Sequence, residues 1–131
     1  LRELVMFQRP INHKYRGKRV KFADEPLKSK YPAGVRFDAL GFPDFSEYAK
    51  VGPNGPCVVK IAMRGNRSFG PDGDFGEANE ACGYPRSFID PDYTWHHHQD
   101  RTTMLLIPYD LHDAVKHSGG VWVIKELGER S

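Results

Sequence analysis

Residues 92–120 read DYTWHHHQDRTTMLLIPYDLHDAVKHSGG and contain five of the six histidines of the chain, three of them consecutive. Within this segment, residues 93–98 and 102–107 are rich in β-branched and aromatic residues, and the polar Gln-Asp-Arg of residues 99–101 separates them. Two short runs of this composition joined by a polar turn are typical of a β-hairpin. The sequence therefore predicts a hairpin with histidines at the end of its first strand.

A helix is predicted directly after this hairpin. Asp110 is placed to cap it, an apolar stripe follows at helical spacing, and Gly119 and Gly120 end it; the stripe consists of Leu111, Ala114 and Val115. The predicted order is strand, turn, strand, helix. If the helix packs across both strands, His112 in its first turn approaches the histidines of the hairpin.

Converging imidazoles suit a divalent metal ion of borderline-soft character. A further imidazole beside such an ion is able to take a proton from water. Geometry sets a condition, because His96 and His97 point to opposite faces of a regular strand and share one site only where the strand ends or bulges. His112 and His117 lie roughly 140° apart around an ideal helix, so His112 is the safer ligand of the two.

Less specific interpretations of these residues compete with a metal site. A run of histidines in a loop also binds adventitious metal, although flanking strands and an internal position argue against a purification tag. His117 near a helix C-terminus is favoured by the macrodipole alone. Trp95 is expected in the core rather than as a platform for stacking bases.

The overall composition indicates one soluble domain. The chain has 131 residues, 27% charged and 39% hydrophobic residues, and a formal net charge of +2. No window of about 18 apolar residues predicts a membrane span, and no basic segment followed by an apolar one predicts a cleaved signal. The chain begins at Leu1, which favours a domain of a longer protein. Cys57 and Cys82 either pair or stay reduced, and they are too few for a four-thiolate zinc site.

Upstream segments supply a basic run and a supporting core. Residues 12–21 are basic, a pattern that usually marks a solvated surface and less often a phosphate-binding one. In residues 31–56 the aromatics expected in the core are Phe37, Phe42, Phe45 and Tyr48. Residues 57–63 predict a strand with Cys57, Val59, Ile61 and Met63 on one face. Residues 74–82 predict a short helix with Asp74 as its cap, Glu77 as capping-box partner, and a stripe of Phe75, Ala78 and Cys82.

The stretches YTWHHHQD (93–100) and TMLLIPYDLHDAVKHSGG (103–120) resemble the Trp-His-His branch of the HNH/endonuclease VII superfamily. That branch occurs as C-terminal nuclease domains of bacterial polymorphic toxins and colicin-like bacteriocins. KYPAGVRF (30–37) and GFPDFSEYA (41–49) resemble the segment before the histidines in those domains, so the resemblance spans about residues 14–120. It implies an α+β fold with a ββα-metal (His-Me finger, HNH-like) core of hairpin plus helix, elaborated by an irregular N-terminal part and a short strand and helix.

The resemblance implies that residues 1–131 form one nuclease toxin domain. Within it we expect a basic irregular part (1–56), a supporting strand and helix (57–91), the catalytic motif (92–120) and a tail (121–131). His96 matches the first metal ligand, His97 the general base and His112 the helical ligand. Thr103 stands where the family pattern has Asn, nine residues before His112. Lys116 replaces a further histidine of the helix, so His117 becomes the candidate third ligand. Candidate phosphate contacts are His98, Arg101, Lys116, Arg16, Lys18 and Arg19.

The chemistry that the resemblance implies is phosphodiester hydrolysis with one divalent ion, for which zinc, nickel, magnesium and manganese all remain open. The expected substrate is DNA, the expected partner a cognate immunity protein, and the expected state a monomer without membrane contact. The domain is expected to leave its producer within a larger toxin and to act in the cytoplasm of a target cell. Two alternatives stay open: an RNase or tRNase on the same scaffold, and a non-catalytic metal- or nucleic-acid-binding module.

Overall fold

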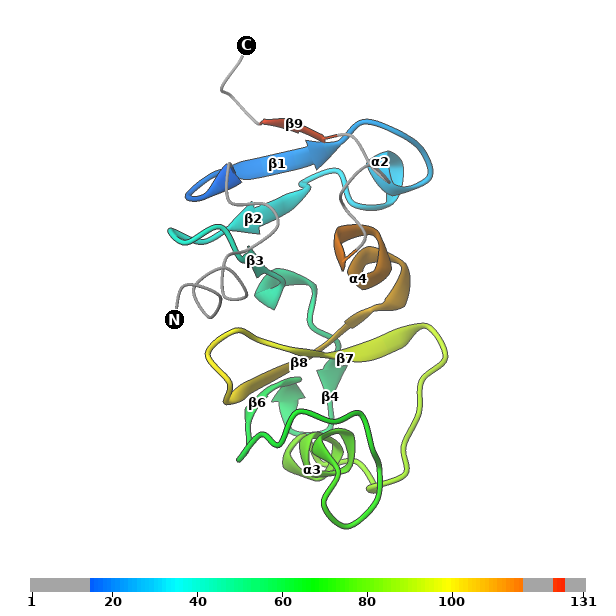
Figure 1. Ribbon diagram of the computed structural model, residues 1–131. Coiled ribbons are helices and arrows are strands. Elements are labelled where there is room, and N and C mark those ends of the chain that lie inside the picture. Colours follow the sequence, from blue (N-terminus) through cyan, green and yellow to red (C-terminus); the bar gives the residue numbers. More distant parts are fainter. Residues whose placement is uncertain (1–14, 117–123, 127–131) are drawn as a thin grey trace. The chain divides into compact units, whose positions relative to one another are not determined.

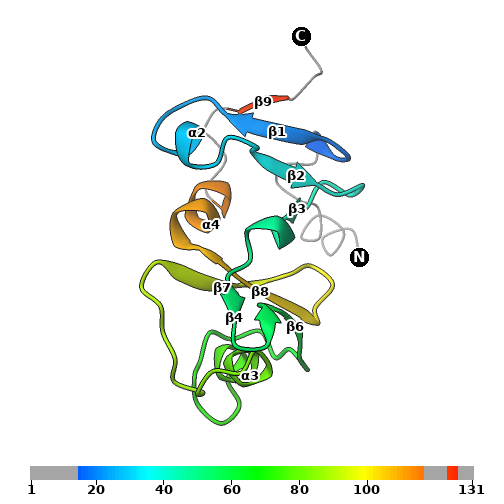
Figure 2. The ribbon, with the colours of Figure 1, turned by 180° about the vertical axis from the view of Figure 1, so that it is seen from behind.

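A computed structural model describes residues 15–116 and 124–126 of the chain. The chain forms two compact units: unit 1 comprises Leu1–Asp44 and Asp113–Ser131, and unit 2 comprises Phe45–His112. Figures 1 and 2 show their elements from opposite sides. Each unit is described by itself.

Unit 1 is built on an antiparallel sheet with the strand order β3 (Pro43–Asp44), β2 (Val35–Phe37), β1 (Arg19–Phe22) and β9 (Ile124–Glu126). A one-turn helix, α2 (Leu27–Lys30), connects β1 to β2. Side chains alternate along β1 and β2, since Val20, Phe22, Val35 and Phe37 are buried whereas Lys21 and Arg36 are exposed. Gly34 has φ 69°, and a Cβ there would fall on the Val20 carbonyl. The close approach of the chain before β2 to β1 therefore requires glycine at this position.

Unit 2 is built on a three-stranded antiparallel sheet with the order β6 (Val58–Lys60), β8 (Thr103–Pro108) and β7 (Tyr93–His97). Before it come a 3₁₀ helix, η2 (Ser46–Tyr48), and a small hairpin of β4 (Val51–Gly52) and β5 (Gly55–Pro56). Helix α3 (Asp74–Ala81) precedes β7. Helix α4 (Tyr109–Lys116) follows β8 directly, and its residues up to His112 belong to unit 2. The central strand β8 is buried over Thr103–Ile107, which explains its continuous apolar sequence.

The hydrophobic core of unit 2 lies between this sheet and α3 (Figure 1). Trp95 is 4% exposed, and its Nε1 donates a hydrogen bond to Asn79 Oδ1 of α3 at 2.9 Å. This core also contains Cys57, Phe75, Ala78, Cys82, Met104 and Leu106. Val59, Ile61 and Met63 pack against it, which confirms the face predicted for residues 57–63, although only residues 58–60 pair as a strand. The core position predicted for Trp95 is confirmed.

The mixed helices and sheets agree with the predicted α+β class, and the hairpin followed by a helix is confirmed. Phe37 and Phe45 are buried as expected, whereas Phe42 and Tyr48 are half-buried. Helix α4 begins at Tyr109, so Asp110 lies inside its first turn rather than before it. The end of the helix predicted at Gly119 and Gly120 lies outside the described residues. No helix in the described ranges combines the length and apolarity of a membrane span.

The cap predicted for helix α3 is also wrong. Asp74 does not cap α3, because Gly73 occupies the N-cap position and no side chain there bonds to the first turn. The exposed N–H groups of the helix are satisfied from an earlier loop instead. Asn66 Oδ1 accepts from Asp74 N at 2.9 Å, and the Ser68 carbonyl accepts from Phe75 N and Gly76 N at 3.1 Å. The Asp74 carboxylate is thereby free for other contacts.

Cys57 and Cys82 form a disulfide, which settles the alternative that the sequence left open. The bond closes a loop with a sequence separation of 25 residues and joins the chain before β6 to the residue after α3. Both sulfurs belong to the core cluster, and both cysteines are at most 1% exposed. The disulfide therefore fixes the C-terminal end of α3 to the sheet.

We expect Cys57→Ala/Cys82→Ala to lower the free energy of unfolding by about 3 kcal/mol, because a loop of this length loses chain entropy when it is closed. Urea titration of the oxidised wild-type protein against the double variant measures the difference. Addition of dithiothreitol serves as a control, since it should destabilise the wild type and leave the variant unchanged. Equal stability of the two oxidised proteins would contradict the expectation.

Candidate functional site

The histidine run lies at the end of β7, where strand geometry separates neighbouring side chains. In the β7–β8 ladder His96 is opposite Leu105 and His97 is opposite Met104. Successive side chains of a strand point to opposite faces. The contacts follow this rule, because His97 lies with Trp95 on the face of α3, and His96 lies on the face of η2 and α4. The strand ends at His97.

His96 lies among aromatic rings and other imidazoles. Its ring centre is 5.0 Å from that of Phe45, 5.2 Å from that of His112 and 6.3 Å from that of His98. Burial and, after it, the neighbouring imidazoles of His112, His98 and His97 together lower the pKa of His96 to about 3. His96 is therefore neutral near pH 7 and keeps a lone pair for a cation.

The separation of the His96 and His112 rings can be compared with that of two imidazoles that bind one metal ion. Two imidazoles on one tetrahedral zinc, with Zn–N bonds of about 2.0–2.1 Å, have ring centres roughly 5 Å apart. The observed separation of 5.2 Å agrees with this value. His98 Nδ1 is buried and has no hydrogen-bond partner among the residues that the structure describes. Among the described residues, no group of three or more His, Cys, Asp or Glu side chains is arranged to hold a metal ion. The third ligand expected, His117, lies outside the described residues.

The hairpin turn is held by Asp100. Its carboxylate accepts hydrogen bonds from the backbone N–H of Thr102 and Thr103 at 2.9 and 2.8 Å and from Thr103 Oγ1 at 2.6 Å. Burial opposes ionisation of Asp100, but these hydrogen bonds and the neighbouring His98 lower its pKa well below the usual range. Thr103, which stands at the Asn position of the family pattern, is thus engaged with the turn.

The same turn places the remaining residues of the hairpin tip. The Thr103 carbonyl accepts from His98 N at 2.9 Å, and the His98 carbonyl accepts from Arg101 N at 3.1 Å. Arg101 has φ 64°, is exposed, and its guanidinium makes no hydrogen bond or ion pair with any described residue. Arg101 is therefore available to an anion from solvent.

His97 contacts a buried carboxylate on the opposite face. Its Nε2 lies 3.1 Å from Asp74 Oδ2 and 3.0 Å from the Asn66 carbonyl oxygen. Its ring centre is 5.8 Å from that of Phe75, and its side chain is 27% exposed. Sequence reasoning missed this contact, because it assigned Asp74 to helix capping.

Asp74 is fully buried and accepts hydrogen bonds from the first residues of the preceding loop. Its Oδ1 accepts from Arg64 N at 2.8 Å, and its Oδ2 accepts from Gly65 N at 2.7 Å and from Asn66 N at 3.1 Å. Burial alone would raise the pKa of Asp74, but these backbone hydrogen bonds and the one from His97 lower it below its usual value. Asp74 is therefore ionised at neutral pH.

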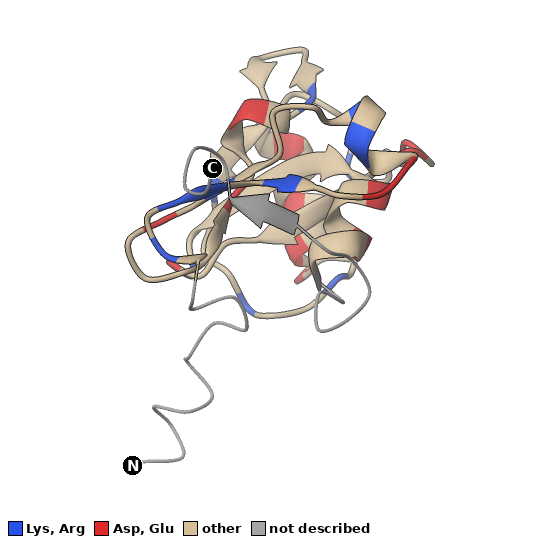
Figure 3. Ribbon diagram, turned by 90° about the horizontal axis from the view of Figure 1, so that it is seen from above, with Lys and Arg blue, Asp and Glu red and all other residues tan. Residues whose placement is uncertain are grey.

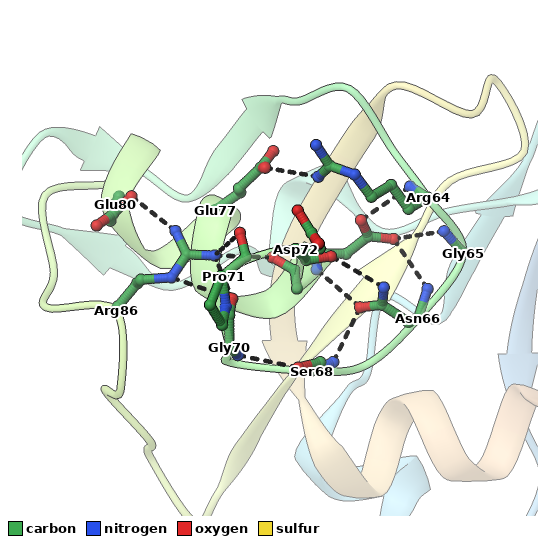
Figure 4. Close-up of polar contacts among 12 residues, drawn as sticks. Arg64, Gly65, Asn66, Ser68, Gly70, Pro71, Asp72, Glu77, Glu80 and Arg86 are labelled. Atoms are coloured by element: carbon green, nitrogen blue, oxygen red, sulfur yellow. Dashed lines mark hydrogen bonds and ion pairs between the residues drawn. The ribbon is translucent and has the colours of Figure 1, made fainter.

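The rest of this loop is tied to α3 by side chains (Figure 4). Arg64 pairs with Glu77 at 2.7 Å, so the predicted capping-box partner binds an arginine instead. Asn66 Nδ2 donates to the Asp72 carbonyl at 3.0 Å. Arg86 pairs with Glu80 at 2.9 Å and donates to the Gly70 carbonyl. Residues 64–73, which we name the Asp74 loop, are thus fixed from both sides.

Apart from Arg101, the lysines and arginines named from the sequence as phosphate contacts lie in unit 1. Arg16 and Lys18 are exposed before β1, and Arg19 opens β1 with its guanidinium donating to the Ala33 carbonyl at 3.2 Å. Lys116 is the last residue of α4. Basic and acidic positions both occur along the described ribbon (Figure 3). The structure brings His96, His98 and His112 together in unit 2 and places His97 on the opposite face of β7.

The histidine pair and the hairpin-helix order lie within a segment that matches a known family. A family model described as a nuclease of the HNH/ENDO VII superfamily with conserved WHH matches residues 85–126. Comparison with curated proteins and with solved structures gives no match. Trp95, His96 and His97 supply the three letters of the WHH motif, and the structure gives each a different neighbour: Asn79, His112 and Asp74.

We expect Asp100→Asn to destabilise the WHH hairpin by an amount on the order of 1 kcal/mol at pH 7, because the turn loses a charged acceptor. The folded pKa of Asp100 is depressed, so its contribution is present above the unfolded pKa of about 3.9 and is lost as the pH falls below it. Urea unfolding of both proteins between pH 7 and pH 3 measures this. A stability difference that stays constant or grows toward pH 3 would refute the assignment.

Proposed function

We propose that this protein is a metal-dependent endonuclease that hydrolyses phosphodiester bonds in DNA. The observation that supports it best is the approach of His96 and His112, whose ring centres are 5.2 Å apart inside the segment that matches the WHH nucleases. In this proposal β7, β8 and α4 form a ββα-metal core. The ordered hairpin and helix then bring residues that are 16 positions apart in sequence to one ion.

His96 and His112 hold the ion, and His117 completes the set. Imidazole ligands suit zinc and nickel, while magnesium and manganese bind them more weakly. When bound, the divalent ion supplies positive charge that stabilises the developing charge on the phosphate and the departing oxygen. In this proposal His98, whose ring centre is 6.3 Å from that of His96, contacts the same phosphate.

His97 takes the proton from the attacking water. The water loses one proton to the imidazole, its oxygen bonds to phosphorus, and the bond to the 3′ oxygen breaks. Thr103 acts indirectly, since its hydroxyl and its carbonyl hold the turn that follows His97 and His98. Arg101 supplies a phosphate contact from the hairpin tip, and the contacts further along the nucleic acid come from Lys116, Arg16, Lys18 and Arg19.

The resemblance to polymorphic toxins and bacteriocins supports a biological role for this activity. The chain acts as the antibacterial toxin domain of a larger secreted protein, reaches the cytoplasm of a target cell as a monomer, and is neutralised in its producer by a cognate immunity protein. An RNase or tRNase on the same scaffold is the nearest alternative, because a site that grips phosphate does not by itself distinguish the sugars.

We expect the purified protein to degrade plasmid DNA in the presence of a divalent ion and to lose this activity when EDTA is added. Total RNA incubated in parallel tests the alternative substrate. Selective loss of RNA would replace the DNase by an RNase. Absence of cleavage with every metal, together with a metal-dependent rise in melting temperature, would leave only a binding module.

We expect His97→Ala to lower kcat about 10²- to 10⁴-fold without loss of metal binding, because a general base contributes on that scale. His96→Ala and His112→Ala should weaken metal binding itself, since each removes one imidazole of the pair. Isothermal titration calorimetry with zinc and plasmid cleavage measure the two properties separately. Cleavage by His97→Ala at the wild-type rate would show that another group accepts the proton.

A further inference from the structure

The two ring nitrogens of His97 have different surroundings. Nε2 lies within hydrogen-bond distance of two oxygens, Asp74 Oδ2 at 3.1 Å and the Asn66 carbonyl at 3.0 Å. Nδ1 hydrogen-bonds to no described residue and is not among the buried polar atoms that lack partners, so it is open to solvent. One nitrogen is thus held by the protein, and the other is available.

The chemistry of these oxygens determines which nitrogen carries the proton. A backbone carbonyl accepts hydrogen bonds and has no proton to give. The Asp74 carboxylate is ionised at neutral pH and also only accepts, since its oxygens already receive the N–H groups of Arg64, Gly65 and Asn66. A neutral imidazole has one N–H and one lone pair. The proton therefore resides on Nε2, and the lone pair resides on Nδ1.

We propose that Asp74 is a positioning residue for the nuclease reaction, which holds His97 in the Nε2–H tautomer and presents Nδ1 to the attacking water. This inference rests on the proposed function and assigns a role to a residue outside the WHH motif. The proton taken from water binds to Nδ1, which makes the ring a cation. That cation then faces a buried carboxylate, which stabilises it.

The hydrogen bonds of Asp74 fit a residue that positions His97 better than a residue that only holds the loop. The backbone N–H groups of Arg64, Gly65 and Asn66 would be satisfied equally by a carboxylate that made no further contact. Asp74 Oδ2 instead accepts from two of them and reaches the histidine as well. Asn66 takes part twice, because its amide oxygen fixes Asp74 N and its carbonyl oxygen fixes His97. The Asp74 loop thus orients the ring from two directions.

The tautomer is measurable without any reaction. We expect long-range ¹H–¹⁵N correlation spectra of the metal-free wild-type protein, at a pH where the ring is neutral, to show a protonated Nε2 and an unprotonated Nδ1 for His97. His97→Gln identifies the resonance. A proton on Nδ1 would overturn the proposal, whether or not the protein cleaves DNA.

Kinetics test the role in the reaction. Asp74→Asn keeps the shape of the side chain and removes its charge, so we expect kcat on a defined DNA duplex to fall about 10²-fold or more while KM changes little. Glu77→Gln is the matched control, because it breaks the Arg64–Glu77 ion pair between the same loop and α3 without touching His97. Glu77→Gln should stay within about threefold of the wild-type kcat.

The outcomes separate the possible failures. If Asp74→Asn retains the wild-type kcat, or if Glu77→Gln lowers kcat as much, the positioning role is wrong and Asp74 serves the loop alone. Thermal melting shows whether Asp74→Asn is folded; if it is not, the tautomer of the wild-type protein decides. If the wild-type protein cleaves nothing, the proposed function fails, while the tautomer still confirms or refutes the geometry of the Asp74–His97 pair.

Discussion

The buried carboxylate of Asp74 is the constraint on which the rest of unit 2 depends. A fully buried ionised group is very costly unless hydrogen bonds replace the water that it loses. Asp74 receives them from the backbone of Arg64, Gly65 and Asn66 and from His97, and it lies at the N-terminus of α3, where the helix dipole favours negative charge. The loop, the helix and the last residue of β7 must therefore adopt their observed positions together.

Helix α3 is consequently fixed at both ends by different kinds of interaction. Its first residue is held by charge and hydrogen bonds, and the disulfide of Cys57 and Cys82 holds the residue after its last turn. Between these ends, Phe75 and Ala78 pack against the sheet. A helix of eight residues has little stability of its own, so these tertiary contacts determine its position. Its fixed position in turn gives His97 a fixed partner.

The sequence predicted the hairpin and the following helix because their signals are local: β-branched runs, a polar turn and an apolar stripe. Strand geometry alone gave the condition that His96 and His97 face apart on a regular strand, and their contacts lie on opposite faces of β7. It did not reveal the role of Asp74. Asp74 and Glu77 have the spacing of a capping box, but their side chains bind the backbone and the guanidinium of a loop about ten residues earlier, and Asn66 and Ser68 supply the cap. Local sequence patterns do not show that a distant loop caps the helix while the expected capping residues bind that loop. The available signal was the Arg-Gly-Asn of residues 64–66, in which Gly65 has φ 89° and turns successive N–H groups toward one anion.

Because side chains alternate along a strand, two consecutive histidines lie in different environments on opposite faces of the sheet. A metal ligand must remain neutral, and His96 does so because burial and other imidazoles disfavour its charged form. A base in the proposed reaction must acquire a positive charge, and a nearby anion stabilises that charge. An ionised carboxylate next to His96 would favour the protonated ring and so compete with the metal ion. Because β7 turns His96 toward His112 and His97 toward Asp74, the proposed reaction assigns the two requirements to adjacent residues with separate surroundings.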